Sequence, residues 1–241
     1  MIADTIARIE ITLDSVKPVV LRRIEVPLDI RLDRLHLAIQ AAMGWTNTHL
    51  YELRADGVGW STPDPDADWT DFLDARKARL GDILEDIGTK TLAYLYDFGD
   101  GWEHTIKIER LADPEPGELY PRLIEVTGRC PPEDCGGPWG YAELLAAIKD
   151  PRHERHAELT EWIGDHFDPN SNEAEWLTAE VGNLARSWCR KSVSKRARRR
   201  QPAVLTGEFP RDSCAAQISR KIMAPTSMTL TCGGGAVHQH Q

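Results

Sequence analysis

The sequence predicts an α+β fold built on a mostly antiparallel sheet, with helices packed on the sheet and a helical segment toward the C-terminal end. Three observations lead to this prediction. The first segments alternate apolar and polar residues with the two-residue period of half-buried strands. The connections between them are shorter than the crossover that parallel neighbours require. From about residue 141 onward, apolar residues recur at the three- to four-residue steps of helices.

The first two strands are expected over residues 5–13 and 19–26. In the first, isoleucine and leucine alternate with charged residues and threonine, the pattern of a strand with one buried face. Pro18 and Pro27 bound the second strand, because proline lacks the N–H that a strand interior needs. Since few residues separate the two strands, we expect them to pair antiparallel.

A helix is expected next, with Asp29 as its N-cap and Gly44 as its stop. Its apolar positions recur every three or four residues and therefore share one face, which we expect to pack on the sheet. These positions are Leu32, Leu35, Ile39 and Met43.

Residues 49–55 predict a third strand, and Asp56–Gly57 is expected to turn the chain into a short fourth strand over residues 58–60. The following segment, residues 61–75, is rich in aspartate and proline. We expect it to be a surface loop.

Residues 89–111 predict a hairpin, whose register follows from the requirement that one face stay apolar. A two-residue Asp100–Gly101 turn would mix polar and apolar side chains on both faces. A three-residue loop over residues 99–101 avoids this and places Gly101 where a positive φ is needed. It pairs Phe98 with Trp102, Tyr96 with His104, Tyr94 with Ile106 and Leu92 with Ile108. His104 is then expected beside Tyr96 on the core face, and Asp97 opposite Glu103 on the other.

The remaining elements are one strand, one loop and the last helices. Residues 123–126 predict the strand, and residues 130–138 an ordered loop restricted by its prolines and glycines. The helices are expected over residues 141–148, 153–163 and 173–184.

Charge divides the chain into two parts. The net charge of −9 combines 11 Lys and Arg against 2 Asp and Glu from Arg186 onward with 18 against 36 before it. We therefore expect an acidic domain over residues 1–185 and a basic, unstructured tail over residues 186–241. Because an acidic surface repels phosphates, nucleic acid could bind only through the tail. The candidate contacts are Arg190, Lys191, Lys195, Arg196, Arg198, Arg199 and Arg200. The alternative is a tail that is solvated or folds back on the acidic domain.

The sequence gives no indication of a membrane partner. No apolar run approaches the roughly 18 residues that cross a bilayer, and the first residues lack the pattern of a signal peptide. We therefore expect a cytoplasmic protein, and we expect its five cysteines to be reduced thiols.

Several separated motifs, in this order along the chain, resemble the Ri-plasmid ORF-3-like family. They lie at residues 9–14, 22–27, 35–46, 49–53, 96–104 and 130–137, within a resemblance that covers roughly residues 5–185. The resemblance implies a single α+β domain with a curved sheet and flanking helices, of a kind common on plasmids and insertion elements. It implies no established biochemical function. This chain has Tyr51 where the family usually has a second histidine.

The favoured function is a non-catalytic binding or accessory module of mobile-element origin, which recognises a protein or peptide partner. The sequence lacks the phosphate-loop, dinucleotide-binding, nucleophile-elbow and zinc-protease motifs, and the serines Ser15 and Ser61 lie in acidic surroundings unlike those of a serine recombinase. The acidic domain suggests a cationic partner. Candidate ligand-binding residues are His49, Asp97, Asp100, Trp102, Glu103, His104, Glu133, Asp134 and Trp139.

Two alternatives stay open. One is a hydrolase that depends on a divalent metal, the sole cofactor the sequence suggests, because imidazole and carboxylate groups suit several divalent ions. Its candidate ligands are His49, His104, Cys130, Glu133 and Asp134, with Asp100 as a further oxygen donor. The other is an accessory protein for DNA transactions that acts through the basic tail.

Each candidate also has a structural interpretation. Cys130 and Cys135 lack the second cysteine pair that zinc knuckles usually have, and are expected to stabilise a loop instead. Glu133 and Asp134 could cap the helix near residue 141. Tryptophans near loops and strand ends fill a core edge more often than they line a groove. These are Trp45, Trp60, Trp69, Trp102 and Trp139.

Overall fold

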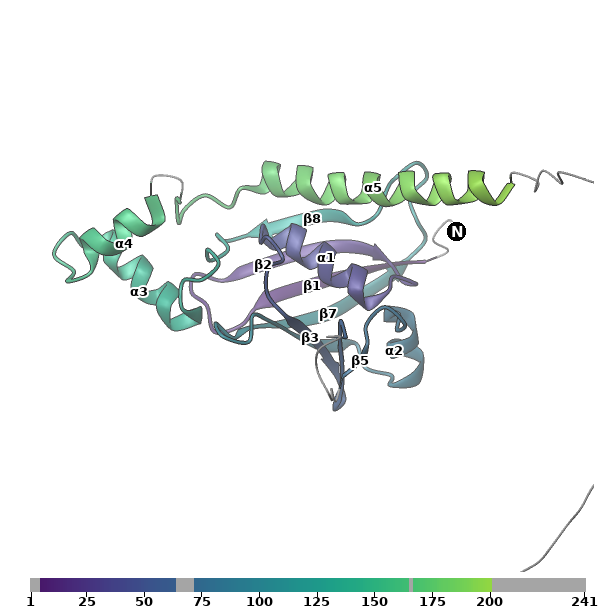
Figure 1. Cartoon of the computed structure of the whole chain (residues 1–241), viewed down its shortest axis with the longest axis horizontal. Helices are drawn as coiled ribbons and strands as arrows, with labels where there is room; N and C mark the ends of the chain where they lie inside the picture. Colours follow the sequence, from purple (N-terminus) through teal and green to yellow (C-terminus); the bar gives the residue numbers. More distant parts are fainter. Residues whose placement is uncertain (1–4, 64–71, 165–166, 201–241) are drawn as a thin grey trace, which may run out of the picture. The chain divides into compact units, whose positions relative to one another are not determined.

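The computed structural model describes residues 5–63, 72–164 and 167–200, with side chains described as far as Arg190 (Figure 1). Its strands are β1 (Ile6–Leu13), β2 (Val20–Pro27), β3 (Tyr51–Ala55), β4 (Val58–Ser61), β5 (Leu73–Asp74), β6 (Thr91–Tyr96), β7 (Trp102–Ala112) and β8 (Arg122–Thr127). Its helices are α1 (Leu32–Met43), α2 (Leu80–Asp86), α3 (Gly137–Lys149), α4 (His156–Ile163) and α5 (Ala174–Arg200).

The strands form one sheet in the order β5-β4-β3-β6-β7-β1-β2-β8. Every neighbouring pair is antiparallel except β4 and β5, which are parallel. The predicted α+β class, with a mostly antiparallel sheet and a C-terminal helix, is confirmed. Among the described residues, no helix combines the length and apolar character needed to span a membrane.

The two faces of the sheet differ in chemistry. On one face, Ile9, Ile11 and Ile24 are fully buried in the main core. Helix α1 contacts β2 and α5, and α5 also contacts β8 (Figure 1). The apolar residues of the alternating pattern predicted for the first two strands therefore form the face on which α1 packs. This agrees with the apolar stripe predicted for the helix.

The other face carries an array of ion pairs, which we call the ion-pair face. Glu25 is almost fully buried and pairs with Arg8 at 2.6 Å and with Arg122 at 2.7 Å. Beside it, Arg23 pairs with three glutamates from three strands. They are Glu10 of β1, Glu109 of β7 and Glu125 of β8.

The expected N-cap of α1 is wrong. The N-cap residue is Arg31, and no side chain caps the helix, because Asp29 instead forms an ion pair with Arg79 at 3.5 Å. The stop is as predicted, since Gly44 adopts the left-handed conformation with φ 83°.

The segment expected to be a loop over residues 61–75 contains the two-residue strand β5, and the short helix α2 that follows was not predicted. Neither element is long enough to show a period in the sequence. Trp69 lies outside the described residues. The predicted turn at Asp56–Gly57 does join β3 and β4.

The hairpin prediction assigns the paired side chains to the correct faces of the sheet, but its strand register is wrong. Tyr96 pairs with Trp102, Tyr94 with His104, Leu92 with Ile106 and Leu95 with Glu103. The cause is Asp97, which has φ 56° and whose carbonyl oxygen accepts a hydrogen bond from Gly101 N at 2.7 Å, so that the strand ends at Tyr96. A two-residue shift moves no side chain to the other face, and His104 therefore still lies in the core.

Of the last helices, α3 begins earlier and α5 extends further than predicted, while α4 begins three residues later, at His156, and ends at Ile163 as predicted. Helix α3 starts at Gly137, and α5 continues to Arg200 across the expected domain boundary at residue 185. Ala185 is buried, and Trp188 packs against the core under a cation–π contact with Arg34. No glycine or proline interrupts the basic segment before Pro202, and arginine, lysine and alanine favour helix.

The division of the chain at residue 185 stays a prediction, and residues 201–241 lie outside the described part. The candidate nucleic-acid contacts also stay predictions. The side chains of Lys191, Lys195, Arg196 and Arg198–Arg200 are not described.

Arg22 holds α1, β2 and the end of β8 together from inside the core. Its guanidinium is fully buried and donates to the carbonyl oxygens of Ala42 at 2.8 Å, Leu21 at 2.9 Å and Thr127 at 2.7 Å. Replacement by an apolar side chain removes the guanidinium donors of these three carbonyl oxygens, of which the hydrogen bond to Ala42 is buried and the other two are partly buried.

We therefore expect Arg22→Met to lower the free energy of unfolding by about 3 kcal/mol. Chemical denaturation measures this change. Arg152→Met is the matched control, because Arg152 is exposed and pairs with Asp150 alone; it should cost less than about 1 kcal/mol. Equal costs for the two variants would contradict the role of the buried guanidinium.

Candidate functional site

The candidate site lies where three loops meet at one end of the sheet. They are residues 44–50 after α1, residues 97–101 between β6 and β7, and residues 128–136 before α3. Thr46 of the first loop and Glu133 of the last are 87 positions apart in the sequence, and specific hydrogen bonds bring the two loops together.

Glu133 joins two of these loops. Its Oε1 accepts a hydrogen bond from the Tyr96 hydroxyl at 2.6 Å, and its Oε2 accepts from Thr46 N at 2.9 Å and from the Thr46 hydroxyl at 2.5 Å. Burial, together with the hydrogen bond to Glu133, raises the pKa of Tyr96 to about 12, so that the phenol remains a donor. Both carboxylate oxygens of Glu133 are therefore used within the protein.

Further contacts hold the third loop against the other two. Trp45 Nε1 donates to the carbonyl oxygen of Pro131 at 2.9 Å, and Gly136 N donates to Asp100 Oδ2 at 3.2 Å. Gly137, with φ 69°, lies so close to Asp100 that a Cβ atom would overlap the Asp100 carbonyl oxygen. The expected capping of α3 by Glu133 or Asp134 does not occur, because Gly136 is the N-cap residue.

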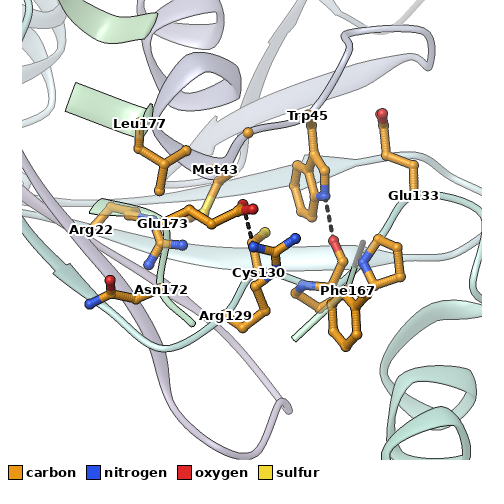
Figure 2. A pocket seen from close by; sticks show the side chains of 13 residues that line it. Arg22, Met43, Trp45, Arg129, Cys130, Glu133, Phe167, Asn172, Glu173 and Leu177 are labelled. Carbon is orange, nitrogen blue, oxygen red and sulfur yellow. Dashed lines mark hydrogen bonds and ion pairs between the residues drawn. The ribbon is translucent and has the colours of Figure 1, made fainter. Parts of the chain in front are cut away.

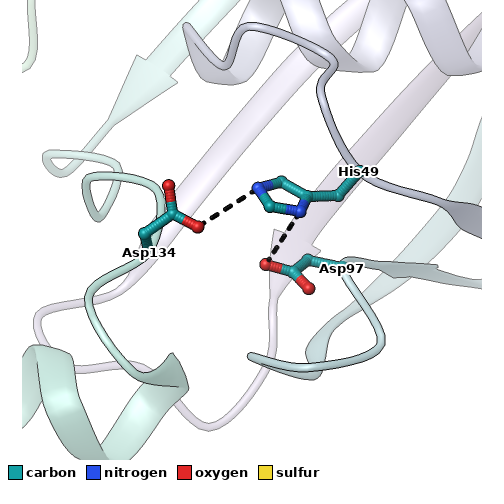
Figure 3. A group of neighbouring side chains, drawn as sticks. All are labelled: His49, Asp97 and Asp134. Atoms are coloured by element: carbon teal, nitrogen blue, oxygen red, sulfur yellow. Dashed lines mark ion pairs between the residues drawn. The ribbon is translucent and has the colours of Figure 1, made fainter.

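His49 lies between two aspartates, one from each of the other loops (Figure 3). Its Nδ1 is 3.6 Å from Asp97 Oδ2, and its Nε2 is 3.3 Å from Asp134 Oδ1. Asp97 is almost fully buried, whereas the Asp134 side chain is 71% exposed. The site thus has a buried, fixed carboxylate on one side of the imidazole and a solvent-facing one on the other.

Other predicted site residues are elsewhere. His104 and Trp102 are buried in the core, and Glu103 is exposed on β7 opposite Leu95 rather than opposite Asp97. Within the described part of the chain, the His/Cys/Asp/Glu group that can surround one ion consists of His49, Asp97 and Asp134. It includes neither His104 nor the other proposed ligands Cys130, Glu133 and Asp100.

Cys130 lines a small cavity of about 100 Å³ beside Trp45 (Figure 2). Burial raises the pKa of the Cys130 thiol and of the Cys135 thiol to about 12, and the two cysteines form no disulfide. Arg129 crosses the cavity to pair with Glu173. These features fit the predicted role of the cysteines in stabilising a loop.

A larger cavity, of about 320 Å³, lies beside His49 and is also lined by His36 and Tyr51. Tyr51, at the position where the family usually has histidine, stacks on His36 with ring centroids 3.7 Å apart. Both aromatic rings therefore form the wall of a cavity that reaches the candidate site.

Of the tryptophans, Trp45, Trp60 and Trp102 are buried, as the core interpretation predicts. Trp139 is 89% exposed on α3. The prediction overlooked Leu50, which is 58% exposed at the same end of the sheet, and wrongly paired Phe98 with Trp102, whereas Phe98 lies in the turn and is 47% exposed. The signal for Phe98 was present, since it stands between Asp97 and Gly99 in the turn.

Fold and site together define a class of protein, an α+β domain whose acidic site is built by loops at one end of a mostly antiparallel sheet. The chain belongs to the plasmid pRiA4b ORF-3-like family, whose model matches residues 5–175. The resemblance found in the sequence motifs is thereby confirmed.

Two relatives are informative about the extent of the similarity. The chain is 51% identical over 193 residues to the uncharacterized protein y4hQ of Sinorhizobium fredii (strain NBRC 101917 / NGR234), a match that covers 79% of this chain and 98% of that protein. It is 31% identical to MM3350, a protein of unknown function from Methanosarcina mazei Go1, whose crystal structure matches with a TM-score of 0.63 over 70% of this chain and 97% of that one.

Two buried histidines near the site are neutral. Burial lowers the pKa of His36 and of His104 from 6.5 to about 4. The hydrogen bonds of His36 agree with a neutral ring, because Nδ1 lies 2.9 Å from the Tyr94 hydroxyl while Nε2 lies 2.5 Å from Asn47 Oδ1, so that one nitrogen accepts and the other donates.

We expect the free energy of unfolding to fall as the pH drops from 6.5 to 4, because in this range the unfolded chain binds protons at both histidines and the folded chain does not. Two such groups give a slope of up to about 2.7 kcal/mol per pH unit. Urea unfolding across this range measures the slope, and His104→Asn should reduce it by about half. An unchanged slope in this variant would show that His104 is not neutral in the folded protein.

A second prediction concerns the contact between Gly137 and Asp100. Gly137→Ala and the control Gly117→Ala both place alanine at a positive φ, which costs about 1–2 kcal/mol, but a Cβ on Gly117 meets no atom within 4 Å. We expect Gly137→Ala to lose a further ~2 kcal/mol in thermal or chemical unfolding, since the loop must move away from Asp100. Equal losses would mean that the two loops are not in close contact.

Proposed function

We propose that this protein is a non-catalytic binding module of mobile-element origin, which recognises a cationic segment of a protein partner. The mobile-element origin rests on the plasmid family to which the chain belongs. The binding function rests on a surface at the candidate site, which we call the acidic–aromatic face. It consists of Leu50, Phe98, Asp100, Asp134 and Trp139.

The observation that carries the proposal is that the three loops and the start of α3, which hydrogen bonds hold next to one another, carry exposed apolar side chains and carboxylates. Leu50 and the turn are adjacent, because the Leu50 carbonyl oxygen accepts a hydrogen bond from Asp97 N at 2.9 Å. The turn and the start of α3 are adjacent through Gly136 and Asp100. Large apolar side chains exposed together, with polar groups around them, are typical of interaction sites.

The chemistry of this face suits lysine or arginine side chains next to apolar ones. The carboxylate of Asp134 faces solvent and forms no ion pair with a lysine or arginine among the described residues. An exposed indole such as that of Trp139 attracts cations through its π-face. Glu133 does not compete for the ligand, since both of its oxygens already accept hydrogen bonds within the protein.

Short synthetic peptides of alternating lysine and leucine test the proposal, with glutamate–leucine peptides as the charge-reversed probe. We expect the lysine peptides alone to bind, and Trp139→Ala or Asp134→Asn to weaken binding about tenfold, because each removes a central contact. Fluorescence anisotropy on labelled peptides measures the affinity.

Trp162→Ala is the matched control, since Trp162 is 48% exposed on α4, outside the acidic–aromatic face. Binding that survives in all variants would place the peptide elsewhere, and an equal affinity for both peptides would contradict recognition by charge.

A further inference from the structure

The group formed by His49, Asp97 and Asp134 has the composition of a metal site. Each residue offers one ligand atom, and these atoms all lie within 4.8 Å of one another. Ligand atoms around a tetrahedral first-row ion lie about 3.4 Å apart, and an ion takes one imidazole nitrogen only, so the side chains must move by about an ångström to close the group around an ion. The three ligands come from three separate loops (Figure 3).

A second observation is that these side chains have bonding capacity that the protein does not use. His49 Nε2 is buried and has no hydrogen-bond partner among the residues that the structure describes. Its distance of 3.3 Å from Asp134 Oδ1 brings the two atoms together without the geometry of a hydrogen bond. Buried polar atoms without partners are uncommon in folded proteins, and a bound ion or water is one explanation for such an atom.

The carboxylate of Asp97 also has one oxygen that accepts no hydrogen bond within the described part of the chain. The residue is more than nine-tenths buried, and its Oδ1 accepts hydrogen bonds from Gly99 N at 2.9 Å and Asp100 N at 3.4 Å. Its Oδ2 faces His49 at 3.6 Å and accepts no hydrogen bond within the described part of the chain. The turn therefore fixes a carboxylate whose second oxygen points at the imidazole and is available.

We propose that His49, Asp97 and Asp134 bind one divalent transition-metal ion. An imidazole ligand argues against Ca²⁺ and Mg²⁺, which take oxygen ligands, and favours Zn²⁺ and its first-row neighbours. Two carboxylates and one neutral imidazole balance the charge of the ion. Three protein ligands leave a fourth position for water or for an oxygen or nitrogen of a bound partner.

This site differs from the metal site expected from the sequence, since Asp97 is a ligand while His104, Cys130 and Glu133 are not. It shares Asp134 with the acidic–aromatic face, but it rests on the grouping of His49, Asp97 and Asp134 and not on peptide recognition. The ion would join the three loops that carry the acidic–aromatic face and would hold them in one arrangement.

Titration of the full, untagged, reduced chain with Co²⁺ tests the site, because cobalt reports its ligands in its visible spectrum. We expect saturation near one equivalent, displacement by Zn²⁺, and no near-ultraviolet charge-transfer absorption of a cobalt–thiolate bond. His49→Ala, Asp97→Asn and Asp134→Asn should each weaken the affinity for Co²⁺ at least about tenfold.

The matched control is Asp100→Asn, which changes a carboxylate in the same turn but keeps an oxygen that can accept from Gly136 N. It should bind Co²⁺ as the unaltered chain does. Thermal unfolding without metal checks that the two aspartate variants and the control remain folded.

Three results would overturn the proposal: no saturable binding of Co²⁺, binding with the thiolate absorption, or equal affinity in the chain and in all three ligand variants. The last would assign the ion to other groups, such as the histidines His238 and His240 near the end of the chain. None of these results bears on whether lysine peptides bind.

Discussion

The carboxylate of Glu133 is the interaction on which the rest of the site depends. It accepts hydrogen bonds from the Tyr96 hydroxyl at the end of β6 and from the backbone N and the hydroxyl of Thr46. These bonds attach the loop of residues 128–136, which is distant in sequence, to the end of the sheet. Hydrogen bonds to a charged acceptor are stronger than neutral ones, and this one is partly shielded from water. The position of Asp134, one residue later, is a consequence of that attachment.

The neighbouring acids Glu133 and Asp134 therefore have opposite roles. Glu133 has both oxygens engaged and acts as a structural bridge, whereas Asp134 has an exposed carboxylate beside His49. In the sequence, nothing distinguishes the roles of these two adjacent carboxylates. The difference arises from the direction in which each side chain leaves a loop constrained by the two prolines before it.

Sequence periodicity predicted the strands and helices well, because burial on one face imposes a two- or four-residue repeat on the residues themselves. It could not distinguish the true hairpin register from one shifted by two residues, since both keep Tyr94 and His104 on the core face. The decisive residue was Asp97, whose positive φ ends the strand and turns its carboxylate toward His49. The meeting of His49 with Asp134 has no local signal in the sequence, because it results from contacts between loops whose two residues are separated by 84 intervening positions.

The ion-pair face of the sheet has a consequence for how copies of this domain can associate. Sheets stack in pairs when both inner faces are apolar, and stacked sheets are also the architecture of fibrils. Here a second layer would have to strip water from Arg8, Arg23 and Arg122 and their glutamate partners, at a cost of several kcal/mol per ion. The face thus opposes the stacking of two copies of the domain through this side of the sheet.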